Sequence, residues 1–425
     1  MVKITSAEEA LKVIDSNQRV FITGNASTPF ALLDALAKRA IGKEFENVEA
    51  LQVLAFGKAP HATPGISKQI RINSLFMGEN VRDAVSRGEA DYTPIFLGEI
   101  PKLFRTTRQP DVALIQVSPP DEHGFCSFGC EVGVSKTAAQ VAKIVIAEIN
   151  EQMPRTLGDS FIHSSKITYM VPTNRPLPEV IQGEPSKLHE RIAEHISNLI
   201  HDGDTLQMGI GGIADAVLKF LKDKRDLGIH TELFSDGIVD LVNNGIITND
   251  KKTFHQGKII AGFLFGTKNL YNFVHNNPII ELHPSDYVND PFLIARNDNM
   301  VAINSAIEID LTGQVCADSI GQKFYSGIGG QVDFVRGAAR SKGGRPIIAL
   351  PSTTKNDAIS RIVPTLKPGA GVVTSRGDVH YVVTEFGAAE LVGKTIRERV
   401  KALIKISHPN FQDSLEQYAK KNNMI

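Results

Sequence analysis

The chain has 425 residues with 46 basic and 47 acidic side chains, so its formal net charge at pH 7 is −1. This balance gives no reason to expect nucleic acid or an anionic membrane as a partner. The apolar runs are too short to span a bilayer, and the N-terminal residues lack the apolar core of a signal peptide. Three cysteines argue against a secreted disulfide framework, so we expect a cytoplasmic protein whose thiols are buried.

Strand-like and helical patterns alternate along the chain. A short strand at 20–22 leads into a small-residue turn and then a helix whose first turn tolerates Pro29. Near the C-terminus, a strand from residue 379 is predicted to break at Gly387 into a short helix. Other apolar runs also indicate strands, at residues 48–56, 72–78, 93–98, 112–118 and 143–150. The alternation predicts an α/β fold with mostly parallel sheets covered by helices.

The chain is predicted to contain two similar domains. The stretch from Met170 to Ser186 is rich in proline and weakly periodic, so we interpret it as a linker between domains at 1–185 and 186–425. Segments of the first domain match segments of the second in the same order, which indicates a duplication. The matched pairs are 19–39 with 205–224, 112–129 with 301–321, and 143–150 with 346–353.

The middle of the chain holds its most informative stretch. A strand at Thr205–Met208 meets the glycine turn Gly209-Ile210-Gly211-Gly212, and a helix continues from Ile213. A second strand at about 227–234 carries Glu232 near its end. Bare backbone amides at a helix start bind anions, so a carboxylate is expected at the rim of an anion-binding crevice.

Two functions fit these residues. Gly209-x-Gly211-x-x-Ala214 matches a dinucleotide fingerprint, with Glu232 roughly 20 residues on as the ribose-binding acid. Alternatively, Glu232 is a nucleophile and the glycine turn holds a thioester ligand. A second glycine turn, Gly327-Ile328-Gly329-Gly330, is hard to explain by a single dinucleotide site. Amides from two such turns are suited to stabilising an oxyanion.

A metal site is not expected. His123, Cys126 and Cys130 lie close together in sequence but lack a second pair of ligands. Cys316 has no identifiable base that would make it a nucleophile.

Six motifs carry a resemblance over essentially the whole chain. In order they are GIGGIADAV, HTELFSDG, NSAIEIDLTGQV, YSGIGGQVDF, EFGAAELVGKTIRERV and ISHPNFQDSL. This series resembles the acetyl-CoA hydrolase/transferase family, and most closely its 4-hydroxybutyrate and butyryl-CoA:acetate CoA-transferase branch. The resemblance implies two similar α/β domains with the active site between them, and a homodimer.

The resemblance also assigns roles to particular residues. It implies that Glu232 is the nucleophile and that CoA binds at Gly209, Ile210, Gly211, Gly212 and Ile213. Gly330 is expected to contribute an oxyanion-hole amide and to contact CoA. The amide near Met208 is a second expected donor, and Ile307 is expected to face CoA. The segment Asn25–Pro29 is expected to line the acyl pocket.

The implied activity is CoA transfer from a 4-hydroxybutyryl-, butyryl- or acetyl-CoA to a carboxylate such as acetate. Acyl-CoA and carboxylic acids are then substrates, and no resident cofactor or metal is called for. An acyl-CoA hydrolase on the same scaffold, a non-catalytic acyl-CoA sensor and an NAD-dependent dehydrogenase are the alternatives.

Overall fold

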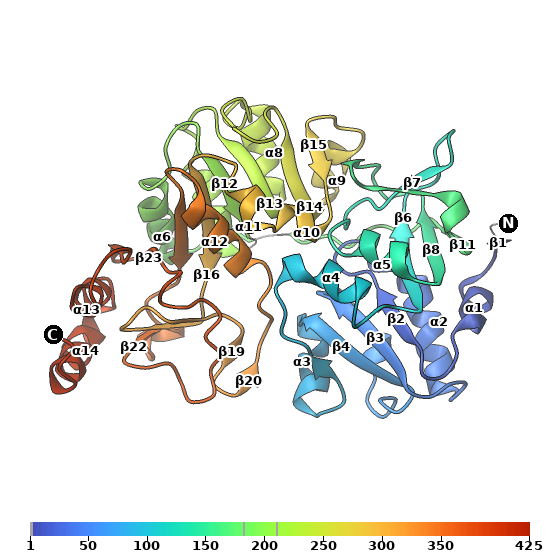
Figure 1. Cartoon of the computed structure of the whole chain (residues 1–425), viewed down its shortest axis with the longest axis horizontal. Helices are drawn as coiled ribbons and strands as arrows, with labels where there is room; N and C mark the ends of the chain where they lie inside the picture. Colours follow the sequence, from blue (N-terminus) through green and yellow to red (C-terminus); the bar gives the residue numbers. More distant parts are fainter. Residues whose placement is uncertain (1–2, 182, 210) are drawn as a thin grey trace. The chain divides into compact units, whose positions relative to one another are not determined.

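The computed structural model describes residues 3–181, 183–209 and 211–425 (Figure 1). The chain divides into two compact units. One comprises Met1–Ile181, Glu232–Asp236 and Ile260–Val288, and the other comprises Gln182–Thr231, Gly237–Ile259 and Asn289–Ile425. The division therefore passes twice through the segment that carries Glu232. The boundary between residues 185 and 186 stays a prediction.

The first large sheet has eight strands, and every neighbouring pair in it is parallel. Its central strands are almost wholly buried because the helices cover both faces. The strands in spatial order are β1 (Lys3–Ile4), β11 (Tyr169–Thr173), β8 (Ile144–Asn150), β6 (Val112–Val117), β2 (Arg19–Ile22), β3 (Val48–Val53), β4 (Ile70–Phe76) and β5 (Asp91–Tyr92).

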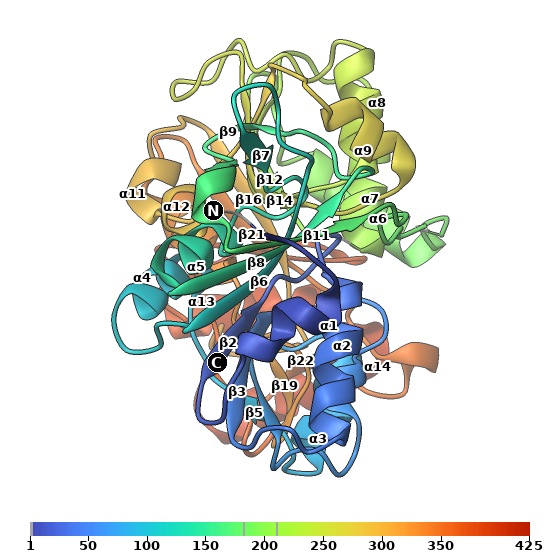
Figure 2. The ribbon, with the colours of Figure 1, turned by 90° about the vertical axis from the view of Figure 1, so that its right-hand side faces the viewer.

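Helices pack on opposite faces of this sheet. Figure 2 shows α1 and α2 on one side of strands β6 and β8, with α4 and α5 on the other. Leu32, Leu33 and Leu36 of α2 are fully buried in the core against the strands. The helices are α1 (Ala7–Ala10), α2 (Phe30–Ile41), α3 (Glu79–Ser86), α4 (Ile100–Arg105) and α5 (Ser135–Val141).

The second large sheet has nine strands and is mostly parallel, with an antiparallel edge pair, β23 and β24. In spatial order its strands are β24 (Gly387–Glu390), β23 (Tyr381–Thr384), β21 (Arg345–Ala349), β16 (Met300–Ser305), β12 (Thr205–Met208), β13 (Gly228–Phe234), β14 (Ile259–Leu264), β15 (Ile280–Leu282) and β9 (Leu157–Gly158).

The later helices are longer on average than those of the first half. They are α6 (Lys187–Ser197), α7 (Gly212–Lys219), α8 (Asp236–Asn243), α9 (Lys268–Val274), α10 (Ser285–Val288), α11 (Pro291–Ile294), α12 (Gln331–Arg340), α13 (Ile396–Lys405) and α14 (Pro409–Lys421). The small sheets are formed by β7 (Phe125–Ser127) with β10 (Phe161–His163), β17 (Glu308–Asp310) with β18 (Val315–Cys316) and β22 (Ile362–Val363), and β19 (Ser319–Ile320) with β20 (Lys323–Phe324). Among the residues that the structure describes, no helix is long and apolar enough to cross a membrane.

The two large sheets repeat one strand order, which confirms the predicted duplication. The order β11-β8-β6-β2-β3-β4-β5 in one corresponds to β23-β21-β16-β12-β13-β14-β15 in the other. Val20 pairs with Ala50 in the first sheet, and Leu206 pairs with Ile229 in the second. Counting forward from these pairs, the first-sheet position that corresponds to Glu232 is Val53. The carboxylate is therefore present in one copy of the repeat only.

Three local predictions differ from the structure. Residues 93–98 do not form a strand, because the edge strand β5 ends at Tyr92 and Pro94 has no N–H for a ladder. Gly387 begins strand β24 rather than a helix, since residues 387–390 pair with β23. The linker prediction also began too early, because its first residues belong to β11.

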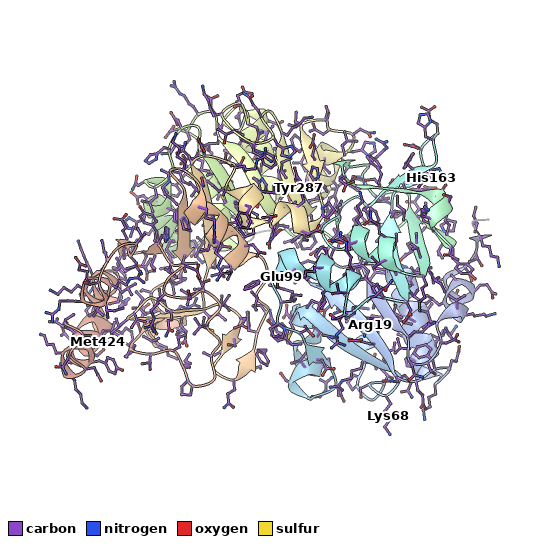
Figure 3. All side chains as sticks on the ribbon, in the orientation of Figure 1. Arg19, Lys68, Glu99, His163, Tyr287 and Met424 are labelled. Atoms are coloured by element: carbon purple, nitrogen blue, oxygen red, sulfur yellow. The ribbon has the colours of Figure 1, made fainter. Side chains whose placement is uncertain are left out.

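Ion pairs link residues at the amino-terminal edge of the eight-stranded sheet. Arg19, labelled in Figure 3, begins β2, and its Nε lies 2.6 Å from Glu49 Oε2. Arg108 Nη1 lies 2.7 Å from the other oxygen of Glu49. At the opposite, carboxyl edge of this sheet, β2 leads into the segment Asn25–Pro29.

Candidate active site

The predicted glycine turn is present and opens directly into a helix. Strand β12 is buried along its length and ends at Met208, Gly209 is exposed, and α7 begins at Gly212. Gly211 is the N-cap of α7 and has φ +116°, a conformation that favours glycine. Ile210 lies outside the described residues. The first amides of α7 have no partner within the helix, so the turn presents donors.

The space in front of this turn differs from one glycine to the next. A Cβ atom added at Gly209 or Gly211 would have no atom of the other described residues within 4 Å, the chain neighbours aside. A Cβ added at Gly212 would collide with the ring of His189, which comes from α6. The first two glycines therefore border open space, whereas Gly212 allows α6 and α7 to pack closely.

Glu232 lies near the end of β13, a strand that is otherwise buried. Glu232 is partly exposed, whereas all the remaining residues of this strand are buried. The Thr231 hydroxyl, one residue earlier, donates a hydrogen bond of 3.1 Å to the carbonyl oxygen of Met208. Strand pairing of Leu206 with Ile229 sets the same register. The end of the glycine-turn strand is thus fixed beside the strand that carries the carboxylate.

Ile307 and Gly330 lie on two further connections at the same sheet. Strand β16 pairs with β12, with Met208 opposite Ile303, and Ile307 follows β16 in a turn where its N–H donates to Cys316 O at 2.9 Å. Gly330 is the buried N-cap of α12, and its carbonyl accepts from Phe334 N–H at 3.1 Å. Because α12 leads back to the start of the parallel strand β21, its N-terminus faces the carboxyl edge.

The nine-stranded sheet therefore gathers these residues at its carboxyl edge. The turn after β12, the end of β13, the turn after β16 and the N-terminus of α12 all belong to that edge. Ligands of open α/β sheets bind there. The groups present at that edge are the Glu232 carboxylate and the backbone N–H groups of two glycine turns, and the predicted role of Glu232 as the nucleophile stays a prediction. The individual roles predicted for Met208, Ile307 and Gly330 stay predictions.

The turn after β2 in the eight-stranded sheet contains an unusual asparagine. Asn25 has φ +53° and is 3% exposed, and its Oδ1 has no hydrogen-bond partner among the described residues. Gln116 Nε2 donates to Thr28 O at 2.9 Å and holds the same turn. Glu148 is buried beside the first amides of α2, and burial raises its pKa to about 7. The predicted role of Asn25–Pro29 in the acyl pocket stays a prediction.

The side chains that could bind metal are dispersed. In residues 3–181, 183–209 and 211–425, no three or more His, Cys, Asp or Glu side chains form a group suited to a metal ion. Cys126, Cys130 and Cys316 are free and buried, as predicted. Burial raises the pKa of the Cys126 thiol to about 12, so it does not supply a thiolate near neutral pH.

Sequence reasoning missed several residues that fix the site. Helix α8 begins at Asp236, two residues after the end of β13. Asp236 accepts hydrogen bonds from Thr267, and Thr231 holds Met208. The only signal in the sequence was that Thr231 and Asp236 lie within the motif HTELFSDG. The partner of Thr231 lies 23 residues away and the partner of Asp236 lies 31 residues away, so no local pattern identifies them.

Comparison with known proteins gives a consistent assignment. Residues 1–181 match the model of the acetyl-CoA hydrolase/transferase N-terminal domain, and residues 266–419 match that of the C-terminal domain. The 4-hydroxybutyrate coenzyme A transferase of Clostridium kluyveri is 52% identical, over 99% of this chain and 97% of that protein. The succinyl-CoA:acetate/propanoyl-CoA:succinate CoA transferase of Fasciola hepatica is 47% identical, over 98% of this chain and 87% of that protein.

A solved structure agrees with these relatives. The crystal structure of RipA from Yersinia pestis superposes with a TM-score of 0.94 at 37% identity, covering 100% of this chain and 98% of that one. The predicted resemblance is confirmed. The chain belongs to the acetyl-CoA hydrolase/transferase family.

Proposed function

We propose that this protein is a CoA-transferase that moves CoA between a short-chain acyl-CoA and a free carboxylate such as acetate. The donor is a 4-hydroxybutyryl-, butyryl- or acetyl-CoA, and Glu232 forms a covalent glutamyl-CoA thioester. The observation that carries the proposal is the place of Glu232, the one partly exposed residue of the otherwise buried strand β13, which pairs with the strand that leads into the glycine turn. The named activities of the C. kluyveri and F. hepatica relatives support it.

The reaction proceeds in two half-reactions. The Glu232 carboxylate attacks the acyl-CoA carbonyl carbon, the C–S bond breaks, and an acyl-glutamyl anhydride and CoA thiolate result. The thiolate then attacks the glutamyl carbonyl, which releases the carboxylate of the first acid and leaves the glutamyl-CoA thioester. The carboxylate of the second acid then attacks the glutamyl-CoA thioester, the same steps run in reverse, and the second acid leaves as its acyl-CoA. One thioester replaces another, so the exchange needs no ATP.

The backbone supplies electrostatic stabilisation. Each attack creates an oxyanion, and a well-placed N–H donor is worth roughly 3–4 kcal/mol to such an intermediate. We assign one donor to Gly330 at the start of α12 and one to the amide near Met208. We assign the CoA contact to residues 209–213 and Ile307. Binding of the distant parts of CoA must hold the weakly nucleophilic carboxylate in line with its target.

A hydrolase on the same scaffold is the second candidate, because water in place of the acceptor acid would discharge the same intermediates. The open space at Gly209 and Gly211 favours neither activity. The dehydrogenase alternative leaves the second glycine turn and the C-terminal motifs without a role. We also propose a cytoplasmic location and a homodimer, as in the resemblance drawn from the sequence.

Intact-protein mass spectrometry tests the proposal. Wild-type protein mixed with butyryl-CoA is expected to gain a CoA-sized adduct that maps to Glu232 and disappears when acetate is added. Glu232→Gln is expected to bind CoA but to form no adduct and to transfer no CoA. Steady release of CoA without any acceptor would identify a hydrolase. A wild-type transfer rate in Glu232→Gln would exclude the glutamyl mechanism.

A further inference from the structure

The side chain of Asp236, the first residue of α8, binds the loop after β14. Asp236 Oδ2 accepts the backbone N–H of Thr267 at 2.7 Å. Its other oxygen, Oδ1, accepts the Thr267 hydroxyl at 2.6 Å. Both carboxylate oxygens are therefore engaged by one residue, and the carboxylate is held in a fixed orientation rather than turned toward a substrate.

The hydrogen bonds of Asp236 with Thr267 are the last of several contacts between the segment that starts at Glu232 and the segment formed by β14 and its loop. A Cβ placed on Gly262 of β14 would come within 3.3 Å of the Glu232 carbonyl oxygen, so the backbones are close there. Phe265 N–H donates to the carbonyl oxygen of Phe234 at 3.1 Å. Asp236 and Thr267 continue the same row. Contacts with β14 and its loop thus fix the chain at Glu232, Phe234 and Asp236.

Gly266, the residue before Thr267, allows the Asp236 side chain to pack closely against the backbone. A Cβ on Gly266 would collide with the Asp236 carboxylate. Thr267 is also the N-cap of α9, and its hydroxyl oxygen accepts from Asn269 N–H at 3.3 Å. Any residue larger than glycine at 266 would push the carboxylate off both donors. Gly266 and Thr267 together form a socket for the Asp236 side chain.

We propose that Asp236 is a positioning residue for Glu232: by binding Thr267, it holds the start of α8, and with it the end of β13, so that the Glu232 carboxylate keeps its angle of attack. The inference rests on the proposed function of Glu232. A carboxylate nucleophile is weak, and its rate depends on alignment with the thioester carbon. A displacement of about 1 Å from a productive geometry costs on the order of a hundredfold in rate.

Substitutions at Thr267 separate positioning from simple helix capping. Thr267→Ser keeps the hydroxyl as donor to Asp236 and as cap of α9. Thr267→Asp keeps an acceptor that caps α9 but replaces the donor with a second carboxylate. Thr267→Val removes both. Ser6→Ala is the matched control, because the Ser6 oxygen caps α1 with a bond of the same 3.3 Å length, to Glu9 N–H.

The readout is the rate at which the glutamyl-CoA thioester forms in a single turnover, together with KM for butyryl-CoA and the Tm. We expect Thr267→Asp, Thr267→Val and Asp236→Asn to form the thioester about tenfold to a hundredfold more slowly, with KM changed less than about twofold. Thr267→Ser and Ser6→Ala are expected to form it at the wild-type rate.

Wild-type thioester formation in Thr267→Asp and Asp236→Asn would overturn the inference, whatever their Tm. A drop in Tm without a drop in rate would reduce the Asp236–Thr267 pair to a structural contact. Failure of the proposed function is distinguishable, because the wild-type protein would then form no thioester at all.

Discussion

Thr231 and Met208 are joined by a hydrogen bond of 3.1 Å from the Thr231 hydroxyl to the Met208 carbonyl oxygen. Both residues are buried, at 1% and 3% exposure, so water does not replace the bond. Met208 is the last residue of β12 before the glycine turn, and Thr231 precedes Glu232. The bond therefore couples the position of the glycine turn to the position of Glu232, the proposed nucleophile.

Replacing Thr231 with valine keeps the side-chain shape but removes the donor. We expect Thr231→Val to lower the free energy of unfolding by about 1 kcal/mol, the usual net contribution of a buried hydrogen bond. We also expect a lower kcat, because the turn and Glu232 lose their common register. Thr231→Ser, which retains the hydroxyl, is expected to recover most of the rate. Urea denaturation and steady-state transfer assays test this, and a wild-type kcat in Thr231→Val would contradict it.

The open space at Gly209 allows the proposed CoA contact to be tested without disturbing the fold. Among the described residues, chain neighbours aside, none has an atom within 4 Å of a methyl group there, so Gly209→Ala is expected to leave the Tm close to that of the wild type. A ligand lying against the turn would meet that methyl group, and we expect CoA affinity to fall at least about tenfold, equivalent to roughly 1.4 kcal/mol. Isothermal titration with CoA measures it.

Gly377→Ala is the control for this experiment. Gly377 also has room for a Cβ, whose nearest neighbour would be Ser375 Oγ at 3.6 Å, but it lies in the loop before β23. Its CoA affinity is expected to match the wild type. Equal affinity in Gly209→Ala and the wild type would place CoA elsewhere.

The sequence was sufficient to predict the fold class and the duplication because buried parallel strands leave a strong local signal. Runs such as 112–117 and 144–150 are apolar on both faces and appear as β6 and β8. Gly387–Glu390 was misread because Ala and Glu favour helices, whereas pairing with β23 imposes a strand. Local preference loses to a partner strand that a sequence pattern does not reveal.

The candidate site was predictable only in part. The glycine turn was predictable because glycines, which tolerate a positive φ such as that of Gly211, stand directly before the start of a helix. Glu232 was placed on the correct strand, but its partial exposure depends on what covers the sheet edge. The contacts of Asp236 with Thr267 join the start of α8 to the N-cap of α9, and hydrogen-bond partners so far apart have no sequence periodicity.

A buried ion pair links the starts of two strands in the nine-stranded sheet. Arg345 Nη2, at the start of β21, lies 2.6 Å from Oδ1 of Asp204, just before β12. Burial raises the pKa of Asp204 despite this pair and the His201 N–H bond to its other oxygen. Arg345→Met removes the counter-charge, and we expect it to destabilise the protein by about 3–5 kcal/mol.

The double variant Asp204→Leu/Arg345→Met removes both charges and is expected to recover a large part of that loss, since no unpaired charge stays buried. Thermal unfolding of the wild type, both single variants and the double variant measures the coupling. Additive effects of the two single substitutions would show that the pair is not coupled.

Glu131 makes the stability of the protein depend on pH. The carboxyl group is 2% exposed, and it accepts from Val134 N–H at 2.9 Å and Ser135 N–H at 3.2 Å. Burial outweighs these bonds and raises the pKa of Glu131 from 4.5 to about 7. The folded state therefore binds more protons than the unfolded state between these values. Its stability falls as pH rises through that window and levels off above about 7.

The variant Glu131→Gln has no proton to lose at this position. Between pH 5.5 and 8, we expect the wild type to lose about 2 kcal/mol of stability relative to Glu131→Gln, because 1.36 kcal/mol corresponds to one pKa unit. Comparing the two proteins at both pH values cancels the contribution of Glu148, which is present in each. Urea unfolding at pH 5.5 and pH 8 gives the four free energies. A difference between the variants that is the same at both pH values would mean that Glu131 ionises in the folded protein as readily as in the unfolded chain.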